Sequence, residues 1–154
     1  MTLPTDPDAW RSAPAGRPRR WDVGLAIAAG GAVGGLLRRS VNVLVPAADG
    51  GFPWATFAEN VAGCLLLAVL LVYVSEVWPP RRYVRPFLGI GVLGSFTTFS
   101  TFTNETRALV DAGQAPLAFG YVAASLLAGL AATYVGLWGA RRVAGVARNT
   151  RRTA

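Results

Sequence analysis

Four long apolar stretches dominate this chain of 154 residues and limit what it can fold into. They run over about 23–45, 54–77, 83–102 and 116–138, and together they cover more than half of the sequence. A helix needs roughly 20 mainly apolar residues to cross a bilayer core about 30 Å thick. Each stretch meets that length, so the sequence predicts an all-α integral membrane protein with four transmembrane helices in the lipid bilayer of the cell membrane.

The segments outside these stretches are short or basic. Residues 1–20 are rich in proline, arginine and alanine and show no hydrophobic periodicity, so we expect a disordered basic cytoplasmic tail there. A single four-span domain is expected over 21–140, followed by a second basic cytoplasmic tail over 141–154.

The arginines predict how the chain is oriented in the membrane. All 15 basic residues are arginines, and with 8 acidic residues they give a net charge of +7. Four spans place both termini and the connection between spans two and three on one side, which then holds every arginine except Arg38, Arg39 and Arg107. Positive charge concentrates in cytoplasmic loops, so both termini are predicted to be cytoplasmic. Binding of nucleic acid or anionic lipid by the tails is a less favoured main function, because the tails contain no folded binding domain.

The composition excludes several classes of function. The chain has no histidine, and Cys64 is its only cysteine. Disulfide frameworks, side-chain zinc sites and Ser-His or Cys-His catalytic pairs are therefore excluded. No paired carboxylates are evident for acid–base work either, so we do not expect an enzyme.

The third stretch carries an unusual polar segment over 94–105, in which hydroxyl and amide side chains alternate with three phenylalanines. Hydroxyl side chains compete with the helix for backbone hydrogen bonds, and Gly89, Gly91 and Gly94 weaken the helix further. A third helix broken at mid-membrane, where it lines a cavity, is one interpretation. An intact helix whose hydroxyls bond back to their own backbone is the other.

Further polar and small residues lie within the other spans. Asn60 follows Thr56 by one turn in span two and predicts either a polar cavity or a hydrogen bond between helices. Span four carries a stripe with a spacing of four, which suits either a polar track or simple packing. Its members are Tyr121, Ser125, Gly129 and Thr133. In span one, Gly30, Gly31, Gly34 and Gly35 form two small-xxx-small pairs that favour close helix packing.

Two further features allow more than one interpretation. Glu59 lies near the start of span two and is expected either to pair with Arg38 or Arg39 or to extend toward the interface. The run 89–94 matches the dinucleotide fingerprint G-x-G-x-x-G, but it lies inside a span without the strand that such a site needs.

These motifs together resemble the CrcB/Fluc family of fluoride channels over about residues 24–140. The most specific element is Gly94-x-x-Thr97-Thr98-Phe99-Ser100-Thr101-Phe102-x-x-Glu105. The glycine-rich first span ending in Arg38, the pattern Thr56-x-x-x-Asn60-x-x-Gly63, and Tyr121 with Ser125 support it. Arg39, Glu59 and Gly129 depart from the family pattern.

The resemblance implies an antiparallel dimer of four-helix subunits with two narrow pores. It implies a central sodium ion held by the backbone carbonyls of Gly94 and Thr97. It also implies an anion pore to which Phe99, Phe102, Asn60, Thr98, Ser100, Tyr121 and Ser125 contribute. We assign Gly30, Gly31, Gly34 and Gly35 to packing in the dimer.

The expected function is passive efflux of fluoride from the cytoplasm. The alternative is a small proton-coupled multidrug exporter, which would need a carboxylate at mid-depth, typically in span one. A homodimer requires one sequence to insert in both directions. The uneven distribution of arginines favours pairing with an oppositely oriented paralogue, and the homodimer stays open.

Overall fold

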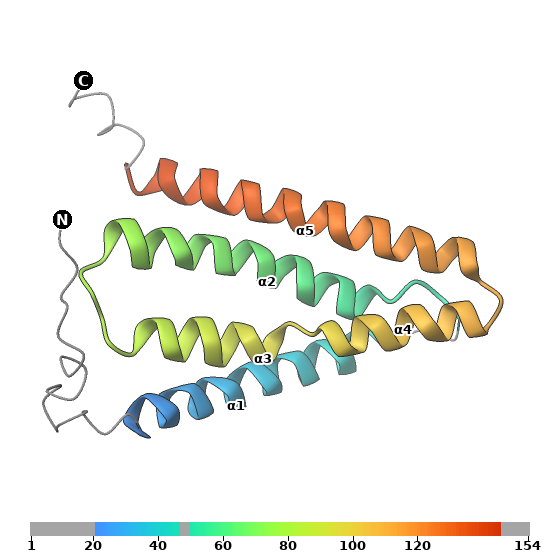
Figure 1. Ribbon diagram of the computed structural model, residues 1–154, viewed down its shortest axis with the longest axis horizontal. Helices are drawn as coiled ribbons and strands as arrows, with labels where there is room; N and C mark the ends of the chain where they lie inside the picture. Colours follow the sequence, from blue (N-terminus) through green and yellow to red (C-terminus); the bar gives the residue numbers. More distant parts are fainter. Residues whose placement is uncertain (1–20, 47–49, 146–154) are drawn as a thin grey trace, which may run out of the picture.

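The chain is all-helical over the residues that its computed structural model describes, which are 21–46 and 50–145. The elements are α1 (Trp21–Leu44), α2 (Trp54–Val72), η1 (Tyr73–Val77), η2 (Arg85–Leu93), α3 (Gly94–Phe96), α4 (Phe99–Asp111) and α5 (Ala115–Val143). They form four long rods that lie side by side, and the chain reverses direction at each connection (Figure 1). The predicted tail over 1–20 lies outside the described residues, as does most of the predicted tail over 141–154. Its first three residues continue α5.

Each predicted span corresponds to one rod. α2 and the π-helical turn η1 together run over Trp54–Val77, and α5 runs over Ala115–Val143. These two helices are long and apolar enough to cross a membrane. α1 has 24 residues but includes Asp22, Arg38 and Arg39, and the third rod is divided among η2, α3 and α4.

Packing does not follow the order of the chain. α1 packs mainly on η2, and α2 packs mainly on α5, so the first and third rods form one pair and the second and fourth form the other. The glycines of α1 explain the first pair. A Cβ atom on Gly30 would collide with the Phe87 carbonyl oxygen, and one on Gly34 would collide with the Val92 carbonyl oxygen. Glycine is therefore required for α1 to approach the η2 backbone this closely.

The turn between α4 and α5 shows how the sequence ends one helix and starts the next. Gly113 has a φ of +75°, a conformation that glycine adopts without a steric cost. Its amide bonds to the Val110 carbonyl at 2.9 Å, and the Gln114 amide bonds to the Leu109 carbonyl at 2.9 Å. This pair of bonds is the Schellman arrangement. Pro116 then lies in the first turn of α5, where proline is tolerated.

The start of α1, the connection between η1 and η2, and the end of α5 lie at one end of the bundle (Figure 1). Two ion pairs join these elements there. Arg82 lies 2.7 Å from Asp22, and Arg141 lies 2.8 Å from Glu76. Asp22 also accepts a hydrogen bond from the Tyr83 hydroxyl at 2.8 Å.

Candidate functional site

The third rod is not helical at Thr97 and Thr98. Both residues are extended, with φ and ψ of −80° and 154° at Thr97 and of −148° and 125° at Thr98. α4 then starts at Phe99, and the Thr98 hydroxyl accepts a hydrogen bond from the Thr101 amide at 3.2 Å. Threonine is a good N-terminal cap because its side chain satisfies one of the free amides of the first turn. The extended pair therefore separates α3 from a properly capped α4.

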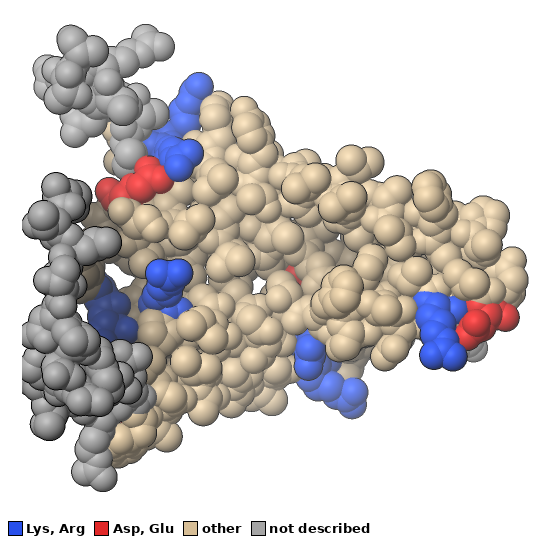
Figure 2. Space-filling view, in the orientation of Figure 1, with Lys and Arg blue, Asp and Glu red and all other residues tan. Residues whose placement is uncertain are grey.

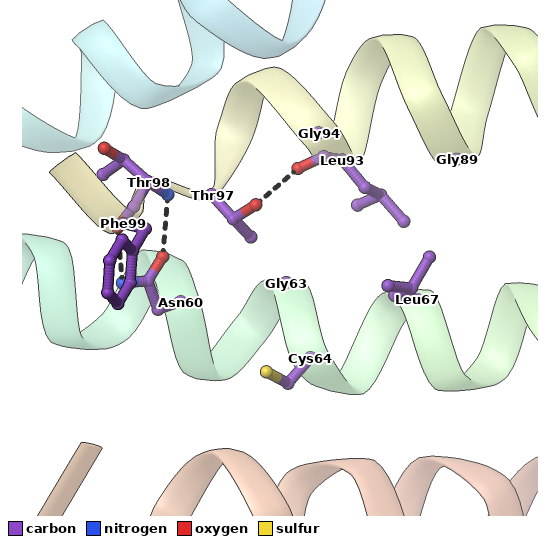
Figure 3. A pocket seen from close by; sticks show the side chains of 10 residues that line it. All are labelled: Asn60, Gly63, Cys64, Leu67, Gly89, Leu93, Gly94, Thr97, Thr98 and Phe99. Atoms are coloured by element: carbon purple, nitrogen blue, oxygen red, sulfur yellow. Dashed lines mark hydrogen bonds between the residues drawn. The ribbon is translucent and has the colours of Figure 1, made fainter. Parts of the chain in front are cut away.

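Asn60 of α2 holds this extended segment through two hydrogen bonds to one residue. The Thr98 amide donates to Asn60 Oδ1 at 2.9 Å, and Asn60 Nδ2 donates to the Thr98 carbonyl oxygen at 3.0 Å (Figure 3). An asparagine side chain has one acceptor group and two N–H donors. One N–H donor of Asn60 is not used in these two bonds. Asn60 thus holds the backbone of another rod at its non-helical segment.

A cavity of about 310 Å³ lies between α2 and the third rod beside this contact. Asn60, Gly63, Cys64, Leu67, Gly89, Leu93, Gly94, Thr97, Thr98 and Phe99 line it (Figure 3). None of these side chains carries a charge at neutral pH, and Asn60, Thr97 and Thr98 supply the polar side-chain atoms. The structure therefore brings five of the predicted site residues, Gly94 and Thr97 among them, around one neutral cavity.

Two of the three phenylalanines of the polar segment form a ring pair on the first turn of α4. The ring centroids of Phe99 and Phe102 lie 5.9 Å apart, and Phe102 lies 5.1 Å from the Tyr121 ring on α5. Phe99 is 80% exposed, although it also lines the cavity. The aromatic rings therefore extend from the neutral cavity toward α5.

Glu105 joins three rods through a buried polar cluster. Its Oε1 accepts from the Thr56 hydroxyl at 2.8 Å, and its Oε2 accepts from the Tyr121 hydroxyl at 2.9 Å. Thr56 and Tyr121 have no solvent-exposed surface in this structure. The resemblance included Glu105 in its motif, but the sequence assigned no partners to it, because its contacts lie 49 and 16 residues away.

Glu59 behaves differently from both expectations. It is 1% exposed, so it does not extend to the interface, and it forms no ion pair with Arg38 or Arg39. Its Oε1 accepts from Asn42 Nδ2 of α1 at 2.7 Å instead, and its Oε2 has no hydrogen-bond partner among the described residues. The amide of Asn42 therefore takes the place of an arginine as the partner of this carboxylate.

The other predicted polar residues divide between the site and local packing. The Ser100 hydroxyl lies 3.3 Å from that of Thr98, next to the cap of α4. Ser125 Oγ is buried on α5 without a partner in the described part of the chain. The hydroxyls of Thr97, Thr103 and Thr133 donate to carbonyl oxygens four residues earlier in their own rods. These three hydroxyls therefore bond back to their own backbone, as one of the two interpretations of the polar residues expected.

The four glycines assigned to dimer packing also differ among themselves. Gly30 and Gly34 make their close approach within the subunit, against η2. A Cβ atom on Gly31 would lie 3.2 Å from Ser95 Oγ, whereas one on Gly35 would meet nothing within 4 Å. Of the four, Gly35 leaves the most room for a neighbouring molecule.

Comparisons with known proteins identify related sequences. The family model described as CrcB-like protein, Camphor Resistance (CrcB), matches residues 25–137. The Fluoride-specific ion channel FluC 2 of Nocardia farcinica is 47% identical over 124 residues, which cover 80% of this chain and 89% of that protein. The Fluoride-specific ion channel FluC 2 of Bacillus subtilis is 43% identical over 121 residues, covering 79% and 89%.

A third relative is longer than this chain. The Fluoride-specific ion channel FluC 3 of Streptomyces avermitilis is 54% identical over 112 residues, which cover 73% of this chain but 55% of that protein. All three alignments are long enough to include most of the four rods that carry the cavity, the ring pair and the Glu105 cluster. The chain is therefore an all-helical membrane protein, and it belongs to the CrcB-like family.

Proposed function

We propose that this chain is the subunit of a fluoride-selective channel that lets fluoride leave the cytoplasm passively, rather than an enzyme. The observation that carries the proposal is the neutral cavity at the extended segment, lined by Asn60, Thr98 and Phe99. The alignments with two relatives named as fluoride-specific ion channels cover 80% and 79% of this chain. Fluoride enters cells from acidic surroundings as neutral HF and is trapped as the ion, so an open downhill path is sufficient.

The chemistry of the lining suits a small anion. The edge of a phenylalanine ring carries partial positive charge, and Phe99 and Phe102 offer two such rings at 5.9 Å. Hydroxyl and amide donors replace part of the hydration shell of the ion without adding a full charge. Conduction requires binding that is weak enough for release. We therefore include Phe99, Phe102, Asn60, Thr98 and Ser100 in the pore.

The polar groups of α5 continue this path in our proposal. Tyr121 lies beside Phe102 and donates to Glu105, and Ser125 lies one turn further along α5 with a hydroxyl that has no hydrogen-bond partner among the described residues. A buried hydroxyl without a partner has a donor to offer to a passing ion. The Thr133 hydroxyl donates to the Gly129 carbonyl oxygen of its own helix, so the polar track along α5 is short.

A second subunit would complete the pore. Phe99 is 80% exposed in the single chain although it lines the cavity, and a partner would cover its ring. We propose an antiparallel dimer with a break of the third helix at mid-membrane. Five of the eight arginines of the described chain lie at the end of the bundle where α5 ends, namely Arg81, Arg82, Arg85, Arg141 and Arg142. This distribution favours a one-way subunit with cytoplasmic termini and a paralogous partner.

The backbone carbonyls of Gly94 and Thr97 suit a sodium ion at the centre of such a dimer. In a continuous helix the Gly94 carbonyl would accept from the Thr98 amide, but that amide donates to Asn60. Uncharged oxygen atoms are ligands that hard cations accept. A sodium ion held there would supply positive charge that raises the local potential for an anion.

Fluoride efflux from liposomes that contain the protein, purified together with its oppositely oriented paralogue, tests the function, with chloride efflux as the control. We expect fluoride efflux without chloride efflux. Replacing Phe99 and Phe102 with isoleucine should slow efflux about tenfold, because a ring interaction of about 1.4 kcal/mol corresponds to that factor. Asn60→Asp should stop efflux, because it adds a negative charge beside the ion.

Phe119→Ile is the matched control, because Phe119 is 77% exposed on α5 and lies outside the cavity. Unchanged efflux in the Phe99, Phe102 and Asn60 variants would overturn the site assignment. Absence of fluoride efflux, together with resistance to ethidium in cells, would support the multidrug exporter instead. Equal reporter signal on both faces of the membrane from a C-terminal fusion, or fluoride transport by the protein expressed alone, would favour the homodimer.

A further inference from the structure

Arginines gather at one end of the bundle, where α5 ends and η2 begins. Separate blue patches lie on the left of the molecule in Figure 2, at the end where α5 ends in Figure 1. Arg81, Arg82 and Arg85 come from the connection and the start of η2, and Arg141 and Arg142 come from the last turn of α5. The carboxylates of Asp22 and Glu76 pair with Arg82 and Arg141. Within residues 21–46 and 50–145, the other three arginines have no carboxylate partner, so this end carries excess positive charge.

Arg142 is held in a defined position, and it has no carboxylate partner within the described part of the chain. Its guanidinium lies 4.3 Å from the centroid of the Trp138 ring. Stacking on a ring covers one face of the guanidinium and leaves the N–H groups at its edge able to donate. The adjacent Arg141 is fixed by Glu76, to which its Nε and a terminal nitrogen donate at 3.0 Å and 2.8 Å.

A cavity of about 330 Å³ lies directly at these arginines. Tyr134, Leu137, Trp138, Arg141 and Arg142 line it. Tyr134 is 71% exposed and lies one turn before Trp138 on the same face of α5. Cationic groups therefore lie at the end of the helix, the Trp138 ring lies next to them, and Leu137 and Tyr134 follow toward the middle of the bundle.

We propose that this cavity binds an anionic phospholipid, with the lipid phosphate at Arg142 and an acyl chain along Leu137 and Tyr134. Basic pockets at the ends of transmembrane helices bind lipid headgroups, and tyrosine and tryptophan favour the headgroup layer. Arginine donates in a planar fork that matches a phosphate. The order of charge, ring and aliphatic surface along α5 matches the order of phosphate, glycerol and acyl chain in a lipid.

This site is separate from the proposed pore. None of its lining residues contributes to the cavity at Asn60 and Thr98. The proposal requires only that the chain lies in a membrane, and it does not depend on which ion the protein conducts.

Native mass spectrometry of the full chain in detergent tests the proposal, with added phosphatidylglycerol or phosphatidylcholine as the probe. We expect phosphatidylglycerol to be retained about fivefold more tightly than phosphatidylcholine, because one arginine near the membrane surface contributes about that much. Arg142→Gln should remove most of the preference, and Trp138→Leu should weaken it by releasing Arg142. Arg107→Gln is the matched control, because Arg107 is exposed and pairs with Asp111 on α4.

Equal retention of both lipids by the wild-type chain would overturn the proposal. An unchanged preference in Arg142→Gln would overturn it as well. Soluble glycerophosphoglycerol without acyl chains separates a lipid site from a simple phosphate site. If it displaces phosphatidylglycerol at the same concentration as the intact lipid does, the acyl-chain part of the assignment is wrong.

Discussion

The extended segment in the middle of the bundle and the arginine-rich end are both held by contacts between rods, but by different kinds. In the middle, the neutral side chain of Asn60 forms two hydrogen bonds of 2.9 Å and 3.0 Å to the backbone of Thr98. At the end, charged pairs join Arg141 to Glu76 and Arg82 to Asp22, and the arginine side chains are about half exposed.

The difference follows from the solvent around each region. A backbone group in the apolar part of a membrane protein cannot bond to water, so each lost partner leaves an unsatisfied group. Exposed ion pairs compete with water and salt and usually contribute about 0–1 kcal/mol. The middle is therefore expected to be sensitive to single changes, and the end is expected to tolerate them.

Removal of the Asn60 side chain should have the largest effect. Asn60→Ala leaves the amide and carbonyl groups of Thr98 without these partners, at a cost of about 3 kcal/mol. That corresponds to a decrease in melting temperature of roughly 6–12 °C for a chain of this size. Thermal unfolding in detergent and fluoride efflux from liposomes measure the two consequences.

Asn42→Ala is the control for Asn60→Ala, because Asn42 also bonds between rods but does not touch the extended segment. Fluoride efflux should survive that change. If Asn60→Ala melts within about 2 °C of the wild type, the two bonds do not hold the extended segment.

A methyl group on the close face of α1 should have the next largest effect. Gly34→Ala places a Cβ atom against the Val92 carbonyl oxygen of η2, and the rods must move apart. Overpacking of this kind costs about 2 kcal/mol. Gly35→Ala is the matched control, because a Cβ atom there meets nothing within 4 Å. Equal melting temperatures for the two variants would contradict the observed close approach.

Loss of one hydroxyl from the Glu105 cluster should have a smaller effect. Tyr121→Phe removes the 2.9 Å hydrogen bond to Glu105 Oε2 but keeps the ring against Phe102. We expect a loss of about 1–2 kcal/mol of stability and slower fluoride efflux. Tyr134→Phe on the exposed face of α5 is the control and should change neither stability nor efflux. If both variants have a similar effect, the hydrogen bond of the buried Tyr121 hydroxyl does not contribute specifically.

The smallest effect is expected at the arginine-rich end and depends on pH. Asp22 lies ahead of the apolar run that begins at Val23, and the hydrogen bond from the Tyr83 hydroxyl is the main cause that lowers its pKa, with Arg82 adding to it. A carboxylate with a lowered pKa stabilises the fold above its unfolded value of about 3.9, and this contribution is lost as the pH falls through the folded value.

The wild-type melting temperature should therefore decrease below about pH 4, and Asp22→Asn should remove part of that decrease. Melting curves of both proteins between neutral and acidic pH provide the measurement. If the two curves differ by the same amount at every pH, ionisation of Asp22 does not contribute.

The number and approximate limits of the rods follow from the sequence because they depend on local hydrophobicity. The predicted stretch 54–77 has the same bounds as α2 with η1, and α5 extends the fourth stretch to Val143. The all-helical membrane fold and the family are confirmed. The polar segment 94–105 includes the extended residues Thr97 and Thr98, and several hydroxyl residues in succession compete with the helix backbone.

Contacts between rods do not follow from the sequence in the same way. An apolar helix is similar on all sides, so its rotation about its own axis is not encoded in hydrophobicity. That rotation decides that Asn60 reaches Thr98, 38 positions away, and that Glu59 reaches Asn42 instead of an arginine. It also decides that Gly30 and Gly34 face η2. The dimer, the sodium ion and the orientation of the termini stay predictions.

The interleaved packing of the rods has a consequence for how the protein is made. α1 ends at residue 44 and its partner η2 starts at residue 85, an interval of roughly 2–8 seconds at about 5–20 residues synthesised per second. α2 ends at residue 72 and its partner α5 starts at residue 115, so by the same measure α2 waits about as long, and α5 is the last of the described elements to be synthesised. The first two helices therefore reside in the bilayer as neighbours with little mutual contact, and the bundle closes only after translation has delivered its final helix.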